Sequence, residues 1–200
     1  MRSTRFFLLL IVLSVPRSLL ANTLYFPQVA YGGGYTTTFV IMNTGTAAVA
    51  SQLRLYTQTG AALTPVNVNV PVGGSVRYSV SDPGSTINVA WGVVATDSST
   101  LQGVATFDYR AANGVLITSA GVLGLDGGNS FLLPVDVTST ASTGVAIANT
   151  TTNSVFVNLR LLREDGFGCC ERCTHVSARR ASANSRLRSE HVSPNIRHNI

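Results

Sequence analysis

The sequence contains no lysine, and its three cysteines and three histidines all lie after residue 166. Residues 22–166 therefore have no thiol and no imidazole, which excludes Ser-His-Asp and Cys-His catalysis in that segment. The absence of lysine excludes a phosphate-binding loop of the Gly-Lys-Ser/Thr type. Gly32-Gly33-Gly34 is accordingly interpreted as a crossing between strands.

The formal net charge of +5 belongs to the two ends of the chain. Residues 22–166 carry five arginines and seven acidic residues, whereas residues 167–200 carry six arginines and two glutamates. A slightly acidic middle segment lacks the basic face that nucleic-acid binding requires. We therefore expect no nucleic-acid partner.

Residues 1–21 have the layout of a secretory signal peptide. Arg2 and Arg5 precede a run from Phe6 to Val15 that is apolar except for one serine, and Ala21 provides a small residue for cleavage. The alternative is a membrane anchor, but ten residues of helix reach only about 15 Å of a ~30 Å hydrocarbon core. We expect cleavage near Ala21, a secreted or cell-surface bacterial protein, and no membrane span after cleavage.

Residues 22–130 are predicted to be one module of short strands. Val66, Val68 and Val70 alternate with polar residues, which predicts a half-buried strand. The prolines at its two ends suit a strand boundary or an edge strand rather than a central position. Continuous apolar runs at 39–42 and 89–94 favour central strands.

Turn-forming residues punctuate these strands, and Asn113-Gly114 favours a type I′ hairpin. Seven or eight short strands predict an all-β fold, an immunoglobulin-like antiparallel β-sandwich. Without a cysteine pair, its stability is expected to come from aliphatic residues and Trp91.

The chain also matches itself at a shift of 106 residues. The segment from Asn43 to Val49 faces 149–155, and the Leu-Arg-Leu at 53–55 faces the same tripeptide at 159–161. Repeated units arise by tandem duplication, so 131–166 is predicted to be a partial second repeat.

Residues 25–43, with the Leu-Arg-Leu that follows, resemble the opening of tandem β-sandwich modules in exported bacterial surface proteins. Residues 131–135 and 143–149 resemble the second half of the same pattern. The resemblance covers about residues 25–166 and implies export and a β-rich, surface-associated module. It supplies no catalytic residues. The sequence departs from the pattern near Gly166, where the second unit stops early.

Residues 167–200 differ in composition, with six arginines, three histidines and three cysteines and no periodic apolar pattern. We interpret this tail as a disordered or out-of-frame basic segment. The cluster from Cys169 to His175 has one Cys-x-x-Cys and no second pair at zinc spacing, so no metal site is predicted. Asp126–Ser130 and 164–166 lack the pattern of a calcium-binding loop and are interpreted as turns.

Two further kinds of side chain are candidates for a functional site. Asp108 could pair with Asp97 or Asp82 for acid-base chemistry, but Asp82 and Asp97 stand in turn-forming sequences, so neither an enzyme nor a cofactor is predicted. Tyrosine rings can stack on sugars, and Tyr31 and Tyr35 around the glycine triplet are the preferred ligand-binding patch.

The sequence thus predicts an exported, non-enzymatic structural or adhesive module. The alternative is a carbohydrate-binding accessory module that uses exposed tyrosines. The corresponding partners are other surface proteins or a polysaccharide.

The change of composition after Gly166 leads to a first prediction. Resequencing the coding DNA across codons 160–175 is expected to reveal a one-base change that restores a β-rich continuation of roughly 70 residues, the remainder of a sandwich-sized unit. Confirmation of the present reading frame would contradict the out-of-frame interpretation and make the tail genuine.

Overall fold

The computed structural model describes residues 22–135, 143–163, 166, 168–176 and 181–186. The expected signal peptide at 1–21 lies outside these residues. The regular structure described is entirely β, in twelve strands. These are β1 (Asn22–Tyr31), β2 (Tyr35–Asn43), β3 (Val49–Thr57), β4 (Val66–Val70), β5 (Ser75–Ser81), β6 (Asn88–Thr96), β7 (Leu101–Arg110), β8 (Leu116–Leu123), β9 (Gly144–Ala148), β10 (Val155–Leu162), β11 (Gly168–Val176) and β12 (Ala181–Arg186).

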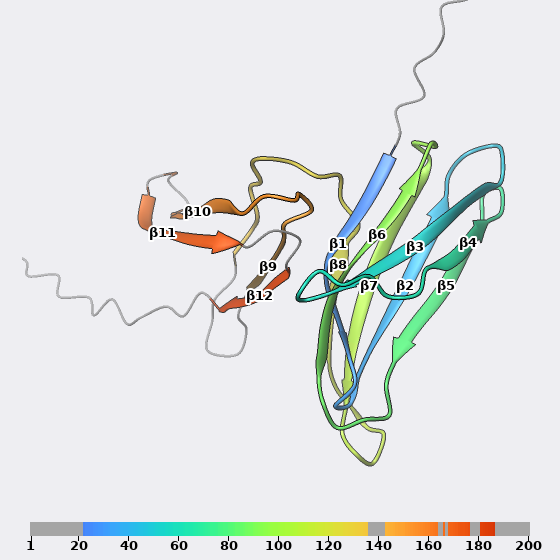
Figure 1. Ribbon diagram of the computed structural model, residues 1–200, viewed down its shortest axis with the longest axis horizontal. Helices are drawn as coiled ribbons and strands as arrows, with labels where there is room; N and C mark the ends of the chain where they lie inside the picture. The colour runs from blue at the N-terminus through green and yellow to red at the C-terminus, as the bar shows by residue number, and fades with distance from the viewer. Residues whose placement is uncertain (1–21, 136–142, 164–165, 167, 177–180, 187–200) are drawn as a thin grey trace, which may run out of the picture.

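Strands β1–β8 form two four-stranded antiparallel sheets, which we call the first sandwich (Figure 1). Sheet I has the order β1-β6-β3-β4, and sheet II has the order β5-β2-β7-β8. The predicted all-β sandwich is thereby confirmed. The runs predicted as central strands lie in β2 and β6, and β4, flanked by Pro65 and Pro71, is an edge strand as expected.

Alternate residues of each sheet point into the space between the sheets. Phe39 and Ile41 of β2 face Leu53 and Leu55 of β3 in one buried cluster. Phe26 of β1 meets Phe39 edge-on, with ring centroids 5.1 Å apart. Since Phe26 belongs to sheet I and Phe39 to sheet II, this contact joins the two sheets.

Trp91, which was expected to contribute to stability alongside the aliphatic residues, lies outside this main core. Side chains alternate along a strand, and Ala90 and Val94 of β6 are in the main core. Trp91 and Val93 therefore point to the outer face of sheet I, where they form a second, separate buried cluster.

The hairpin between β7 and β8 corrects another expectation. The Gly114 amide donates to the Ala111 carbonyl, so the two central residues of the turn are Ala112 and Asn113, and Gly114 is its fourth residue. Gly114 has a φ of 81°. This pattern is a turn closed by a left-handed glycine, not the predicted type I′ hairpin.

Strands β9–β12 form two two-stranded antiparallel pairs, β9 with β12 and β10 with β11, which we call the second unit. The tail was expected to contain no strand, and for β11 and β12 this expectation is wrong. β9 and β10 each offer the main-chain groups of a strand edge, and an extended segment can pair with such an edge whatever its side chains are. β12 and β11 occupy these edges. Residues 177–180 and 187–200 of the tail lie outside the described part of the chain.

Candidate functional site

Tyr31 and Tyr35 flank the turn that links β1 to β2. Gly32 and Tyr35 exchange two backbone hydrogen bonds of 3.1 and 3.0 Å across this turn. Tyr31 is half-buried and packs against the main core. Tyr35 is half-buried as well and stacks on Tyr109 of β7, with ring centroids 4.8 Å apart. Each ring thus has its own packing partner, and the partly exposed stacked pair is Tyr35 with Tyr109.

The glycines of this turn are required by the close approach of two other connections. Gly33 donates its amide to the Gly84 carbonyl at 2.8 Å, and Gly34 accepts a hydrogen bond of 2.9 Å from the Arg110 amide. A Cβ at Gly34, which has a φ of 90°, would lie 2.5 Å from the Arg110 carbonyl oxygen. The triplet is a crossing between strands, as predicted, and it holds three connections together.

The opposite end of the first sandwich is organised around Asn43, which is 2 % exposed. Its Nδ2 donates to the Ala47 carbonyl at 2.7 Å, and its Oδ1 accepts from the Gly45 amide at 2.9 Å and from Thr100 Oγ1 at 2.8 Å. One side chain therefore fixes the β2–β3 turn and ties it to the β6–β7 connection. The sequence indicated a turn at Asn43-Thr44-Gly45 and placed Asn43 in a repeat, but it did not predict this hydrogen-bond network.

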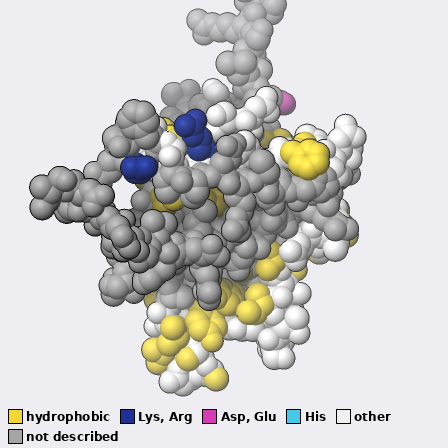
Figure 2. All heavy atoms as spheres, turned by 90° about the vertical axis from the view of Figure 1, so that its left-hand side faces the viewer, with side chains coloured by type: hydrophobic (Ala, Val, Ile, Leu, Met, Phe, Trp, Pro, Cys, Tyr) yellow, Lys and Arg dark blue, Asp and Glu magenta, His cyan; other side chains and the backbone are white. Residues whose placement is uncertain are grey.

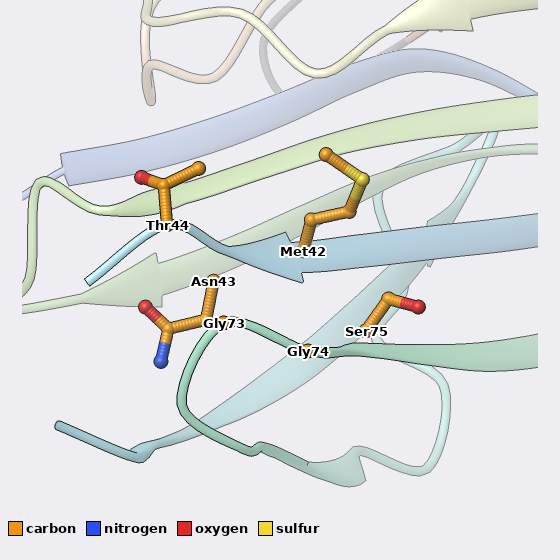
Figure 3. Close-up of a pocket in the computed structure, with 6 residues that line it drawn as sticks. All are labelled: Met42, Asn43, Thr44, Gly73, Gly74 and Ser75. Atoms are coloured by element: carbon orange, nitrogen blue, oxygen red, sulfur yellow. The ribbon is translucent and has the colours of Figure 1, made fainter. Parts of the chain in front are cut away.

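A hollow of about 260 Å³ lies beside this turn (Figure 3). The figure shows the side chains of Met42 and Asn43 leaving β2 on opposite sides of the strand. The hollow is lined by Met42, Asn43, Thr44, Gly73, Gly74 and Ser75. These lining residues have no titratable side chain, so the hollow offers no acid or base.

The second unit repeats the hydrogen bonds of the Asn43 turn. Asn149, 4 % exposed, donates Nδ2 to the Asn153 carbonyl at 2.7 Å. Its Oδ1 accepts from the Thr151 amide at 3.0 Å. The donor and acceptor spacings of two and four residues are the same as at Asn43, and the two asparagines are 106 residues apart.

The carboxylates weighed as an acid-base pair have local partners instead. Asp108 accepts from Ser119 Oγ at 2.7 Å and lies 3.8 Å from Arg110. Asp82 accepts from the Gly84 amide at 2.7 Å within its own turn. Asp97 follows β6, whereas Asp82 precedes it, so the two stand at opposite ends of that strand. Among the residues that the structure describes, no three potential metal-ligating side chains cluster.

A group of aromatic side chains covers the outer face of sheet I. Tyr56 of β3 stacks on Trp91 with ring centroids 4.4 Å apart and an interplanar angle of 16°. Tyr25 of β1, Val93 and Ala148 of β9 complete the cluster. We call these five residues the outer aromatic cluster. Only the continuous apolar run of β6 signalled it, because such runs are typical of strands covered on both faces.

Trp91 is only 4 % exposed, although it faces away from the main core. Its Nε1 is buried and has no hydrogen-bond partner among the residues that the structure describes. Leaving such a donor unpaired costs about 1–3 kcal/mol. Two favourable contacts of Trp91 act against this cost. Tyr56 of sheet I stacks on the Trp91 ring, and Ala148 of the second unit packs against it.

No helix in the described segments is long and apolar enough to span a membrane. No family model matches the sequence, and no curated protein matches it. Among solved structures, the crystal structure of Thermotoga maritima 1070 is similar at a TM-score of 0.44 and 14 % identity. The match covers 54 % of this chain and 96 % of that one. The resemblance to exported tandem modules stays a prediction.

The Asn43 network generates a second prediction. Asn43→Ala leaves the Gly45 amide and the Ala47 carbonyl without their side-chain partner, so we expect it to lower the free energy of unfolding by about 2–3 kcal/mol. Urea unfolding, followed by the fluorescence of the single tryptophan, measures this loss. Asn69→Ala on the exposed face of β4 is the matched control and should change stability by less than about 0.5 kcal/mol. Equal effects of the two variants would contradict a structural role for Asn43.

Proposed function

We propose that this protein is an exported, non-enzymatic structural or adhesive module, built as a sandwich that docks onto a following unit of the same kind. The observation that carries the proposal is the burial of Trp91 and Val93 on the outer face of sheet I. An outer face of a free-standing sandwich would be exposed to water, and a large buried apolar patch there marks a contact with another unit.

The contact is made with the first strand of the second unit. Ala148 of β9 packs against Trp91 and Val93 of sheet I. β9 and β12 lie next to β1 and β6 at this face. Two units fixed against each other through an apolar surface form a stiff pair, whereas a flexible linker alone would leave them free to rotate. Stiffness of this kind suits a building block of a surface structure.

The internal similarity supports the tandem arrangement. At the shift of 106 residues, β9 corresponds to the second half of β2, and β10 corresponds to β3. The turn between the two strands has the same asparagine hydrogen bonds in both units. One polar turn used twice at the same spacing is the result expected of a duplicated unit.

This docking leads to a third prediction. Ala148→Asp places a carboxylate against the apolar Trp91 ring, and moving a charge out of water into such a contact is costly. We expect the second unit to undock, the Trp91 emission to shift to longer wavelength, and proteolytic cleavage between residues 124 and 135 to accelerate about tenfold.

Ala112→Asp is the matched control, because it adds the same charge at the exposed β7–β8 turn. It should leave both the emission and the cleavage rate unchanged. Wild-type emission and cleavage in the Ala148→Asp variant would contradict docking between the units and, with it, the proposed role.

Carbohydrate binding is the second candidate function. The observation that favours it is the Tyr35–Tyr109 stack, two partly exposed rings beside the glycine turn. An amphipathic ring offers an apolar face and a hydroxyl to a sugar.

The fourth prediction separates this candidate from the first. If the module binds sugars, retention on insoluble polysaccharide should fall about tenfold in Tyr35→Ala or Tyr31→Ala, because each substitution removes an apolar ring face on which a sugar could stack. Tyr78→Phe, on β5, serves as the control that keeps the ring. Retention only by whole cells or by other surface proteins favours the adhesive role. Turnover that depends on Asp108 would overturn both.

A further inference from the structure

β8 is the last strand of sheet II, and no strand pairs with its outer edge among the residues that the structure describes. On its inner side β8 pairs with β7 from Leu116 to Leu123. The chain then leaves sheet II, because Leu125 exchanges two backbone hydrogen bonds of 2.9 and 3.1 Å with Tyr25 of β1. The outer edge of β8 therefore offers a row of main-chain groups with which another strand can pair.

The other three edges of the first sandwich each have a feature that hinders pairing with a second chain. β4 has only five residues and lies between Pro65 and Pro71. β5 contains the exposed Arg77, and β1 is bridged by Leu125. Short strands, prolines, charges and covering segments are the means by which β proteins prevent contact between their edges.

β8 lacks a proline, a charge and a covering segment. Residues 111–125 contain no charged residue and no proline. The side chains of β8 are exposed at all but one position, and Ile117 is 58 % and Leu123 64 % exposed. Figure 2, which faces the left-hand side of Figure 1, shows hydrophobic side chains exposed at the lower end of this face. A long, uncharged edge with exposed aliphatic side chains is a site for strand addition from another molecule.

The side chains of β8 alternate between the two faces of sheet II. Val122 packs against the main core, so Leu123 points to the outer face, where it pairs with Val104 of β7. Alternate residues counted back from Leu123 reach Ser119 and then Ile117 on this same face. The register shift of the β7–β8 pair falls between Leu116 and Thr118, so 118–123 is a regular stretch.

We propose that β8 pairs antiparallel with β8 of a second copy of this chain, so that the two four-stranded sheets II join into one continuous sheet. A two-fold axis perpendicular to the sheet keeps both outer faces on the same side, and side chains of the same face then stand opposite each other. With the axis at Ala120, Ile117 of each copy faces Leu123 of the other. Each exposed aliphatic side chain thereby gains an aliphatic neighbour across the strands.

The lack of charge on β8 favours a second copy as the occupant of this edge. In an antiparallel pair of identical strands, a charged residue near the axis would stand close to its own copy and be repelled, and β8 has no such residue. Pairing with β5 of another copy would instead place Arg77 against the apolar edge. The two-fold contact also uses both open β8 edges at once, so assembly stops at two copies.

The second unit leaves this edge accessible. β9 and β12 lie next to β1 and β6 of sheet I, whereas β8 belongs to sheet II. The side chains from Leu116 to Gly121 are exposed with the second unit in place. Docking and pairing through β8 therefore use different sheets. The inference goes beyond the proposed function and does not depend on it.

The test measures the mass of the secreted chain, without residues 1–21, by sedimentation equilibrium over a series of concentrations. A thiol reductant is present, so that a disulfide between tail cysteines cannot imitate the contact. We expect an equilibrium between monomer and dimer. The double variant Ile117→Lys/Leu123→Lys should raise the dissociation constant of the dimer about tenfold or more, because like charges then stand opposite each other. Ile117→Glu/Leu123→Glu should have the same effect.

An equimolar mixture of the two double variants provides the decisive comparison. Each lysine then faces a glutamate across the axis, so the mixture should form dimers again. A variant that had only misfolded could not be rescued in this way. Val72→Lys/Leu132→Lys is the matched control, because it adds the same charges at two exposed aliphatic positions outside β8. It should dimerise like the unchanged chain.

Four results would overturn the proposal. They are a monomer at every concentration up to the solubility limit, dimers that persist in both double variants, a mixture that stays monomeric, and open-ended oligomers in place of dimers. The last would assign the contact to pairing of β8 with a different edge of the next copy.

Discussion

The two sheets of the first sandwich are held together around the Phe26 ring. This ring is fully buried and meets Phe39 of the opposite sheet edge-on. Its position depends on glycines, because a Cβ at Gly103 would lie 2.9 Å from Phe26 Cζ, and one at Gly124 would lie 2.7 Å from the same atom. Large residues from one sheet thus fill space that small residues of the other leave open. Sheet spacing, and with it the position of every connection, follows from this fit.

The ends of the sandwich differ in the way they are closed. At one end, the Asn43 side chain hydrogen-bonds the Gly45 amide and the Ala47 carbonyl, and it thereby fixes the turn that leads into β3. At the other end, Gly33 and Gly34 let the backbone of one connection hydrogen-bond the backbone of two others. The side chains of these connections are therefore not needed to hold the turns in place. A turn fixed by its own buried side chain presents little to a partner. Connections fixed by main-chain contacts can present any side chain, and here the β5–β6 connection presents Ile87 and the β7–β8 connection presents Val115, each more than half exposed.

Much of this fold could be predicted from the sequence, because alternation is a local signal. The Val66, Val68 and Val70 pattern identified β4 and its prolines identified an edge. Features that depend on distant partners were not predictable. The direction of Trp91 follows from which residues of β6 face Phe39, and the Asn113-Gly114 turn follows from a hydrogen bond to Ala111. For the candidate site, Tyr31 and Tyr35 stay a prediction, and the stacking of Tyr35 on Tyr109 could not be predicted because these strands are far apart in the sequence.

The strands of the tail illustrate the same limit in another way. β11 pairs with β10, and β12 pairs with β9, although neither segment has an apolar period of its own. Main-chain hydrogen bonding is independent of sequence, so an open edge can recruit a segment whose composition gives no sign of a strand. Composition therefore predicts whether a segment can build a core, but it does not predict whether the segment will be paired.

The outer faces of the two sheets give the module a direction. Sheet II presents polar contacts to its outer side, such as Thr38 with Ser79 at 2.9 Å and Ser119 with Asp108 at 2.7 Å. Sheet I presents the outer aromatic cluster. The outer face of sheet II also has apolar side chains, because Val40, Val104 and Leu123 are cross-strand partners and Leu123 is 64 % exposed. The two outer faces therefore differ in what covers them. On sheet I the second unit removes Trp91 and Val93 from water through Ala148, which lowers the free energy of the docked arrangement, whereas the apolar side chains on the outer face of sheet II stay exposed.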